Sequence, residues 1–182
     1  MKEKGWISKL QRFQDVYAKI EENLTTWIFI LMCVSLVIQI SCRFVFKLSV
    51  PWSEELIRYS FIAVAFAGAG AALKEETHIE VNLLSGVIGS IKDEIKKQRV
   101  INILTLIRYI LILIISVFIA KLCFNQTAMV FTMAQLTPAL KLPMWLINAV
   151  ILYGFVSIII HSVMKIVICI GTWGKVQERS EA

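Results

Sequence analysis

The sequence predicts an all-α integral membrane protein with four transmembrane helices and additional amphipathic surface helices. Hydrophobic residues make up 58% of the 182 residues and charged residues only 18%, which is more apolar and less charged than a soluble domain. The apolar residues are concentrated in four blocks, each close to the roughly 20 residues that a helix needs to cross a bilayer. The net charge of +6 comes from basic residues between these blocks. That distribution argues against nucleic-acid binding, which would need one basic patch.

The chain divides into surface and spanning segments of a single membrane domain, residues 1–182. Residues 1–23 are predicted to form an amphipathic arm helix at the membrane surface, because their apolar residues recur at helical spacing opposite a charged face. These apolar residues are Trp6, Leu10, Phe13, Tyr17 and Ile20. A similar pattern predicts a second amphipathic helix on the inner surface over residues 80–99. The predicted spans are residues 24–46, 53–73, 100–124 and 143–170, and a cytoplasmic tail follows at residues 171–182.

The second span is the element around which the others are expected to pack. Ser53 is expected to cap its start, directly before Glu54 and Glu55, which suit the positive end of a helix dipole. Its middle is almost entirely Ala and Gly from Ala63 to Ala72. Small residues let helix backbones approach closely in lipid, so this segment is expected to be covered by other helices.

Four spans place both termini on the same side of the membrane. Five Lys or Arg residues precede Leu24, five lie between Lys74 and Arg99, and two follow Gly171. The opposite loops hold fewer, so the positive-inside rule predicts that the N and C termini are cytoplasmic. The five tryptophans all fall at predicted interfaces, as in an aromatic belt. They are Trp6, Trp27 and Trp173 on the inside and Trp52 and Trp145 on the outside.

Four charged residues are predicted to lie at similar depth on the outer side: Arg43, Glu54, Glu55 and Arg58. Glu54 and Arg58 have the i, i+4 spacing at which opposite charges meet on a helix. Ionisable groups near hydrocarbon pair with each other or face protein. The cluster could be a local salt-bridge network, an interface with another membrane protein, or a site that carries protons or ions. Its position at the mouth, away from the bilayer centre, argues against transport chemistry.

The sequence contains no pattern that predicts catalysis, and no cofactor is expected. The four cysteines lack metal-ligand or redox spacing. His78 and His161 could in principle ligate haem between helices, which would make the chain a membrane anchor of an oxidoreductase. By position, however, His161 lies about two turns deeper than His78. The chain also lacks an internal inverted repeat and broken helices, so it is expected to be a subunit of a larger assembly.

Two stretches resemble a known family. WSEELIRYSF, followed by an Ala/Gly-rich span and HIEV, and TPALKLPMW before the fourth span are similar to the small membrane subunit of tripartite ATP-independent periplasmic (TRAP) transporters, the DctQ-like or SiaQ-like family. The motif positions outside the charge cluster are Trp52, His78, Pro138, Leu140, Pro143 and Trp145. The family often has Asp where Asn82 stands and Gly where Lys141 stands.

The resemblance implies a subunit of the bacterial inner membrane with two protein partners. A periplasmic binding protein would deliver an organic acid, and a large multi-span subunit would hold the substrate and sodium sites. This chain would scaffold the large subunit of an elevator-type transporter, surrounded by membrane lipids. C4-dicarboxylates, keto acids, sugar acids and sialic acid all remain open as substrates.

Overall fold

The part of the chain that the computed structural model describes contains four long helices, which confirms the predicted all-α membrane fold. It describes residues 3–87 and 94–181, and their side chains over residues 8–73 and 100–171. The helices are α1 (Glu3–Phe44), α2 (Pro51–Val87), α3 (Glu94–Thr132) and α4 (Met144–Glu181). Each contains a segment long and apolar enough to cross a membrane: Ser8–Phe44, Pro51–Leu73, Val100–Thr132 and Met144–Gly171.

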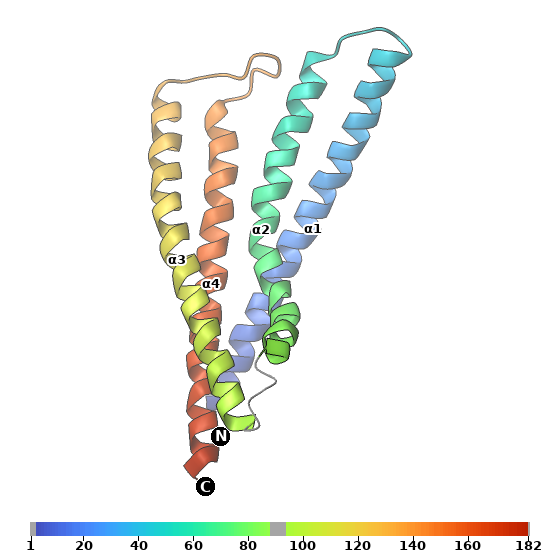
Figure 1. Ribbon diagram of the computed structural model, residues 1–182. Helices are drawn as coiled ribbons and strands as arrows, with labels where there is room; N and C mark the ends of the chain where they lie inside the picture. The colour runs from blue at the N-terminus through green and yellow to red at the C-terminus, as the bar shows by residue number, and fades with distance from the viewer. Residues whose placement is uncertain (1–2, 88–93, 182) are drawn as a thin grey trace.

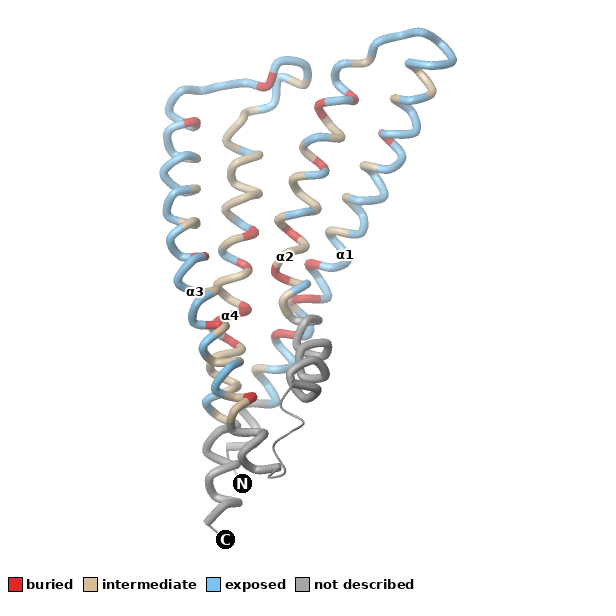
Figure 2. The backbone as a smooth tube through the Cα atoms, in the orientation of Figure 1, coloured by how far each residue is buried: buried red, intermediate tan, exposed pale blue. Residues whose placement is uncertain are grey.

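The helices form two hairpins, α1–α2 and α3–α4, which diverge toward one end of the molecule and meet toward the other (Figure 1). We call the end with the connections at residues 45–50 and 133–143 the loop end, and the end with both termini the terminal end. Helix α4 is central, because it packs against each of the other three. Its span is also the most buried, and that of α1 the least. Figure 2 shows the same contrast along the two helices.

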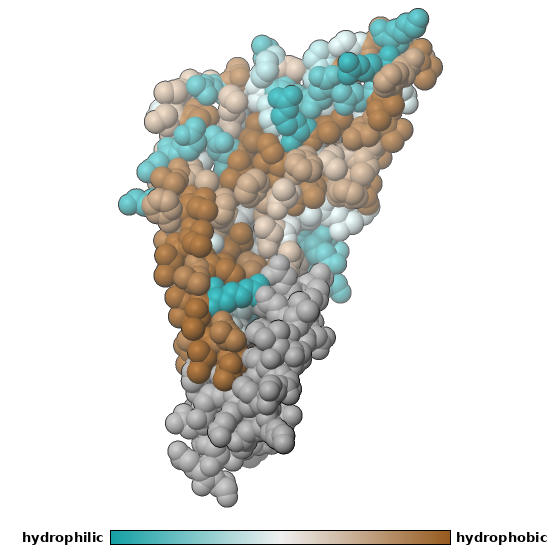
Figure 3. Space-filling model, in the orientation of Figure 1, coloured by the Kyte–Doolittle hydropathy of each residue, from teal (hydrophilic) through white to brown (hydrophobic). Residues whose placement is uncertain are grey.

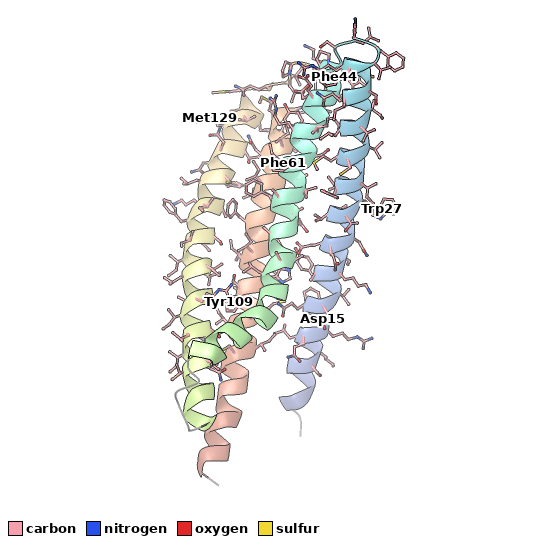
Figure 4. The ribbon with its side chains drawn as sticks, turned by 45° about the vertical axis from the view of Figure 1, so that its right-hand side comes forward. Asp15, Trp27, Phe44, Phe61, Tyr109 and Met129 are labelled. Carbon is pink, nitrogen blue, oxygen red and sulfur yellow. The ribbon has the colours of Figure 1, made fainter. Side chains whose placement is uncertain are left out.

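The observed helices run past several predicted boundaries. Helix α1 crosses the boundary expected between residues 23 and 24, so the predicted arm and first span form one helix. The intervening residues, Ile20 to Thr26, include no glycine or proline that would break it. Helix α2 extends to Val87, where its last part turns away from its first (Figure 4). The predicted helix over residues 80–99 is therefore divided between α2 and α3, and its side chains up to residue 99 lie outside the described ones.

The connection between the last two spans is shorter than predicted, because α3 continues to Thr132 instead of ending at Phe124.

The start of α2 also differs from the prediction. The helix begins at Pro51, a position where proline is well tolerated. Ser53 is therefore inside the helix and does not cap it. Its buried hydroxyl donates a hydrogen bond to the carbonyl of Ser35 on α1, at 3.3 Å.

Polar and small residues form the face of α1 that packs inward, and its apolar residues lie on the outside. Phe13 and Ile20 are about three-fifths exposed, whereas Gln14, Ala18 and Glu21 are buried. The exposed apolar side chains continue along α1 to Trp27, which points away from the other helices (Figure 4). In a membrane, apolar side chains can face lipid, so the polar and small residues of α1 turn toward protein.

Small residues mark the closest helix contacts, as predicted for the Ala/Gly segment of α2. A β-carbon added to Gly68 would lie 3.2 Å from the Thr25 methyl group on α1. One added to Gly70 would collide with the Ser157 hydroxyl on α4. The tightest approach to another helix's backbone is at Gly154 of α4, where an added β-carbon would lie 2.5 Å from the carbonyl oxygen of Phe66.

Candidate docking surface and buried polar cluster

Glu55 holds the loop that connects α3 and α4. Its side chain is buried near the start of α2, and one carboxylate oxygen accepts hydrogen bonds from the backbone N–H groups of Ala139 and Leu140, at 2.9 and 2.6 Å. The other oxygen accepts a hydrogen bond from the Tyr59 hydroxyl at 2.7 Å. Charge-assisted hydrogen bonds of this kind are the strong ones in proteins. We call these four residues the loop clasp, because they fix the second hairpin's loop to the first hairpin.

The clasped loop has a defined backbone of its own. Thr137 and Leu142 are joined by two hydrogen bonds: the Thr137 N–H donates to the Leu142 carbonyl at 2.8 Å, and the Leu142 N–H donates to the Thr137 hydroxyl at 3.0 Å. Lys141 adopts a left-handed φ of 55°. Glycine adopts this conformation without steric cost, so the position favours glycine over lysine.

The other family-motif positions of this loop frame the start of α4. Pro143 pairs with Leu136 in an isolated bridge and directly precedes the first helical residue. Trp145 packs edge-on against Phe131 of α3, with 5.8 Å between ring centroids. Pro138 is exposed beside the clasped amides. The motif residues therefore build the loop and its attachment to both helices.

The structure does not bring the four predicted charges together as one network. Arg43, Glu54 and Arg58 are exposed at the loop end, whereas Glu55 is buried in the loop clasp. Among the described side chains, no ion pair joins Glu54 or Glu55 to either arginine. The local salt-bridge alternative is therefore not what these side chains form. Their role at an interface with a partner remains a prediction.

A second polar site, which the sequence analysis missed, lies between α1 and α4. Glu21 is 1% exposed, and its carboxylate accepts hydrogen bonds from the hydroxyls of Ser157 and Tyr153, the latter at 3.0 Å. His161 Nε2 lies 3.1 Å from the same carboxylate, and His161 Nδ1 lies 3.5 Å from the Gln14 amide nitrogen. We call these five residues the buried polar cluster. It ties the first half of α1 to the middle of α4.

The sequence did carry a signal for this cluster. Tyr153, Ser157 and His161 recur every four residues in a predominantly apolar span, so they share one face of α4. Gln14 and Glu21 are seven residues apart, which also places them on one face of a helix. Buried polar residues in a membrane helix face protein, so the two stripes could have been matched.

The contacts of His161 are relevant to the hypothesis that this residue ligates haem. Both ring nitrogens of His161 have protein partners, and Tyr17 packs against the ring with 5.3 Å between centroids. His78 lies on α2, but its side chain is outside those that the structure describes. Within the described residues, no group of three or more His, Cys, Asp or Glu side chains could hold a metal ion.

The comparison with known families gives one match. A family model described as "Tripartite ATP-independent periplasmic transporters, DctQ component" matches residues 32–170. The matched range contains the loop clasp and the α4 members of the buried polar cluster, and it begins after Gln14 and Glu21. No curated protein and no solved structure matches the chain.

Proposed function

The chain belongs to the DctQ family of tripartite ATP-independent periplasmic transporters, and from this membership we propose that it braces the large membrane subunit of such a transporter. It is a multi-pass small permease component of the inner membrane, and it is not an enzyme. The family match is the observation that carries the proposal. In the proposed orientation, the terminal end is cytoplasmic, as the distribution of Lys and Arg predicts.

The distribution of polar and apolar groups supports the bracing role. The buried carboxylates of Glu21 and Glu55 are used within the chain itself. Exposed large apolar side chains are numerous on the spans of α1 and α3 and fewer on those of α4 and α2. Figure 3 shows hydrophobic residues over much of one face and hydrophilic ones gathered toward the loop end. Such a surface is suited to lipid and to the helices of a second membrane protein.

We assign the contact with the large subunit to the exposed charges of the loop end, with Arg58 in direct contact and Arg43 and Glu54 beside it. An exposed charge near the hydrocarbon boundary is stabilised when a partner protein supplies its counter-charge. The expected result is that Arg58→Ala, or Glu54→Gln combined with Arg58→Gln, lowers the amount of large subunit that co-purifies in detergent. Lys121→Ala is the matched control, because Lys121 is an exposed cation on α3. Full recovery of the complex with the Arg58 variants would refute this assignment.

We also propose that a periplasmic binding protein delivers the substrate, that a sodium gradient drives its import, and that the large subunit moves as in an elevator-type transporter. The transported substrate is an organic acid: a C4-dicarboxylate, keto acid, sugar acid or sialic acid. Sodium-dependent uptake of labelled acids into vesicles tests this, with the three proteins reconstituted together and with each one omitted in turn. Uptake that persists at full rate without this chain would contradict its role, and uptake by this chain alone would contradict it more strongly.

We propose that this chain binds no cofactor and that the sodium sites lie on the large subunit. The engagement of both His161 nitrogens within the buried polar cluster supports this. An absorption spectrum of the purified chain tests it, since a Soret band that shifts on reduction would indicate haem.

A further inference from the structure

A cavity of about 330 Å³ lies at the tip of the first hairpin. It is lined by the end of α1, the 45–50 connection and the start of α2, and its polar lining residues include Gln39, Arg43, Lys47 and Glu54. Its volume is at the lower end of the range for small-molecule sites. The loop clasp is formed by other residues, so this cavity is a separate feature of the loop end.

The charges around the cavity are two cations and one carboxylate. Gln39 and Arg43 are one helical turn apart and share a face of α1. Arg43, Lys47 and Glu54 are all exposed, and the side chains described here include no ion pair among the three. The cavity therefore offers donors for an anionic group next to an acceptor for a cationic group.

The backbone holds Lys47 in a conformation that favours glycine. Lys47 has a φ of 54°, and the Leu48 N–H donates a hydrogen bond to the Cys42 carbonyl at 3.0 Å, which closes the end of α1. Helices that end in this way usually carry glycine at the left-handed position, because a β-carbon is sterically unfavourable there. Lysine is therefore not the residue that this turn favours on steric grounds.

Exposed apolar side chains surround the charged cavity. Phe44, Val45, Phe46 and Leu48 are between 61% and 75% exposed. In Figure 3, hydrophilic and hydrophobic residues lie next to each other at this tip. Cations beside exposed aromatic and aliphatic residues are typical of the boundary between headgroups and hydrocarbon.

We propose that this cavity binds the headgroup of one phospholipid that carries both a phosphate and a primary ammonium group. The phosphate lies on Arg43 and Lys47, and the ammonium group lies on Glu54. The acyl chains lie along the apolar residues next to the cavity, which a free phosphate ester would leave uncovered. This arrangement uses every charged group of the cavity and does not depend on the proposed transport role.

The test is a titration of the full-length chain in detergent with dioleoyl phosphatidylethanolamine, followed by native mass spectrometry. Lys47→Gly removes the cation and also relieves the left-handed backbone, so the variant is expected to fold at least as well as the original chain. Arg43→Gln provides a second variant. Arg58→Gln is the matched control, because Arg58 is an exposed loop-end cation that does not line the cavity.

We expect Lys47→Gly and Arg43→Gln each to weaken binding of phosphatidylethanolamine by about tenfold, as for the loss of one charge-assisted contact, while Arg58→Gln binds like the original chain. Glu54→Gln is expected to abolish the preference for phosphatidylethanolamine over phosphatidylcholine, whose ammonium group cannot donate hydrogen bonds. Unchanged binding in both cavity variants would overturn the proposal. Displacement of the lipid by equimolar soluble phosphoethanolamine would overturn it too, because the acyl chains would then contribute nothing.

Discussion

The contact between α2 and α4 at Gly154 gives the sharpest prediction about the fold. Gly154→Ala would place a methyl group 2.5 Å from the Phe66 carbonyl oxygen and 2.9 Å from the Phe66 carbonyl carbon. Ordinary contacts begin near 3.4 Å, so the helices would have to separate by about 3.4 − 2.5 = 0.9 Å at this point. The obstructing atoms belong to the backbone, and no rotation of a side chain can move them away.

The expected change in the free energy of unfolding is the sum of two opposing effects. Overpacking a tight contact costs about 1–3 kcal/mol, here at the upper end because backbone is involved. Replacing glycine by alanine inside a helix returns about 1 kcal/mol. Gly154→Ala is therefore expected to destabilise the chain by about 1–2 kcal/mol, measured by unfolding in detergent.

Gly68→Ala is the matched control for this prediction. Its added methyl group would lie 3.2 Å from the Thr25 methyl group, which can shift with its side chain. The control is expected to leave stability unchanged or to raise it by up to about 1 kcal/mol. If Gly154→Ala proved as stable as Gly68→Ala, the close approach of α2 and α4 would not be as the structure has it.

Three further predictions concern other contacts. Glu55→Ala should speed hydrogen exchange of the Ala139 amide about tenfold or more, because that amide loses its acceptor; an unchanged rate would count against the loop clasp. Glu21→Ala should lower the free energy of unfolding by about 2–4 kcal/mol, because it leaves the buried His161 without its carboxylate partner; unfolding equal to that of the original chain would refute this. Lys141→Gly should raise stability by up to about 1 kcal/mol, measured in the same way, because its φ of 55° favours glycine; a loss would contradict that reasoning.

The four spans could be predicted from the sequence because the signal for them is local. A span requires only a long enough apolar run, and hydropathy records this directly. For the second span, residues 53–73 were expected, and the part of α2 whose side chains are described, Pro51–Leu73, is long and apolar enough to cross a membrane. The Ala/Gly composition likewise indicated a helix that others approach closely, as Gly68 and Gly70 show.

The packed face of α1 could not be predicted by the same reasoning. Apolar periodicity marks the inward face of a helix only where water covers the outside. Because lipid can cover Phe13 and Ile20 as well as protein can, their spacing does not show which face is packed. The buried residues are instead Gln14 and Glu21, which need polar partners in protein. In a membrane helix, the polar stripe is the better guide.

The hydrogen-bond partners of Glu55 could not be predicted from the sequence, for a different reason. Sequence spacing favoured pairing with nearby charges, since Arg58 is on the same helix. The structure instead gives this carboxylate the backbone amides of a loop more than eighty residues further along the chain. Backbone N–H groups have no side-chain identity, so no residue pattern marks them as partners. Only the approach of the two hairpins reveals why this acid and Tyr59 lie where they do.

The two hairpins are joined at three heights by contacts of different kinds. The loop clasp connects α2 to the second hairpin at the loop end, the Gly154–Phe66 contact joins the backbones of α2 and α4 further along, and the buried polar cluster fixes α1 to α4 beyond it. Sliding one hairpin against the other would break directional hydrogen bonds at the loop end and near the middle of α4, and it would also make the backbones collide at Gly154. The proposed bracing role requires this resistance to shear, since a subunit that supports a moving partner must hold its own shape. The apolar outer faces of the helices can then contact lipid and that partner.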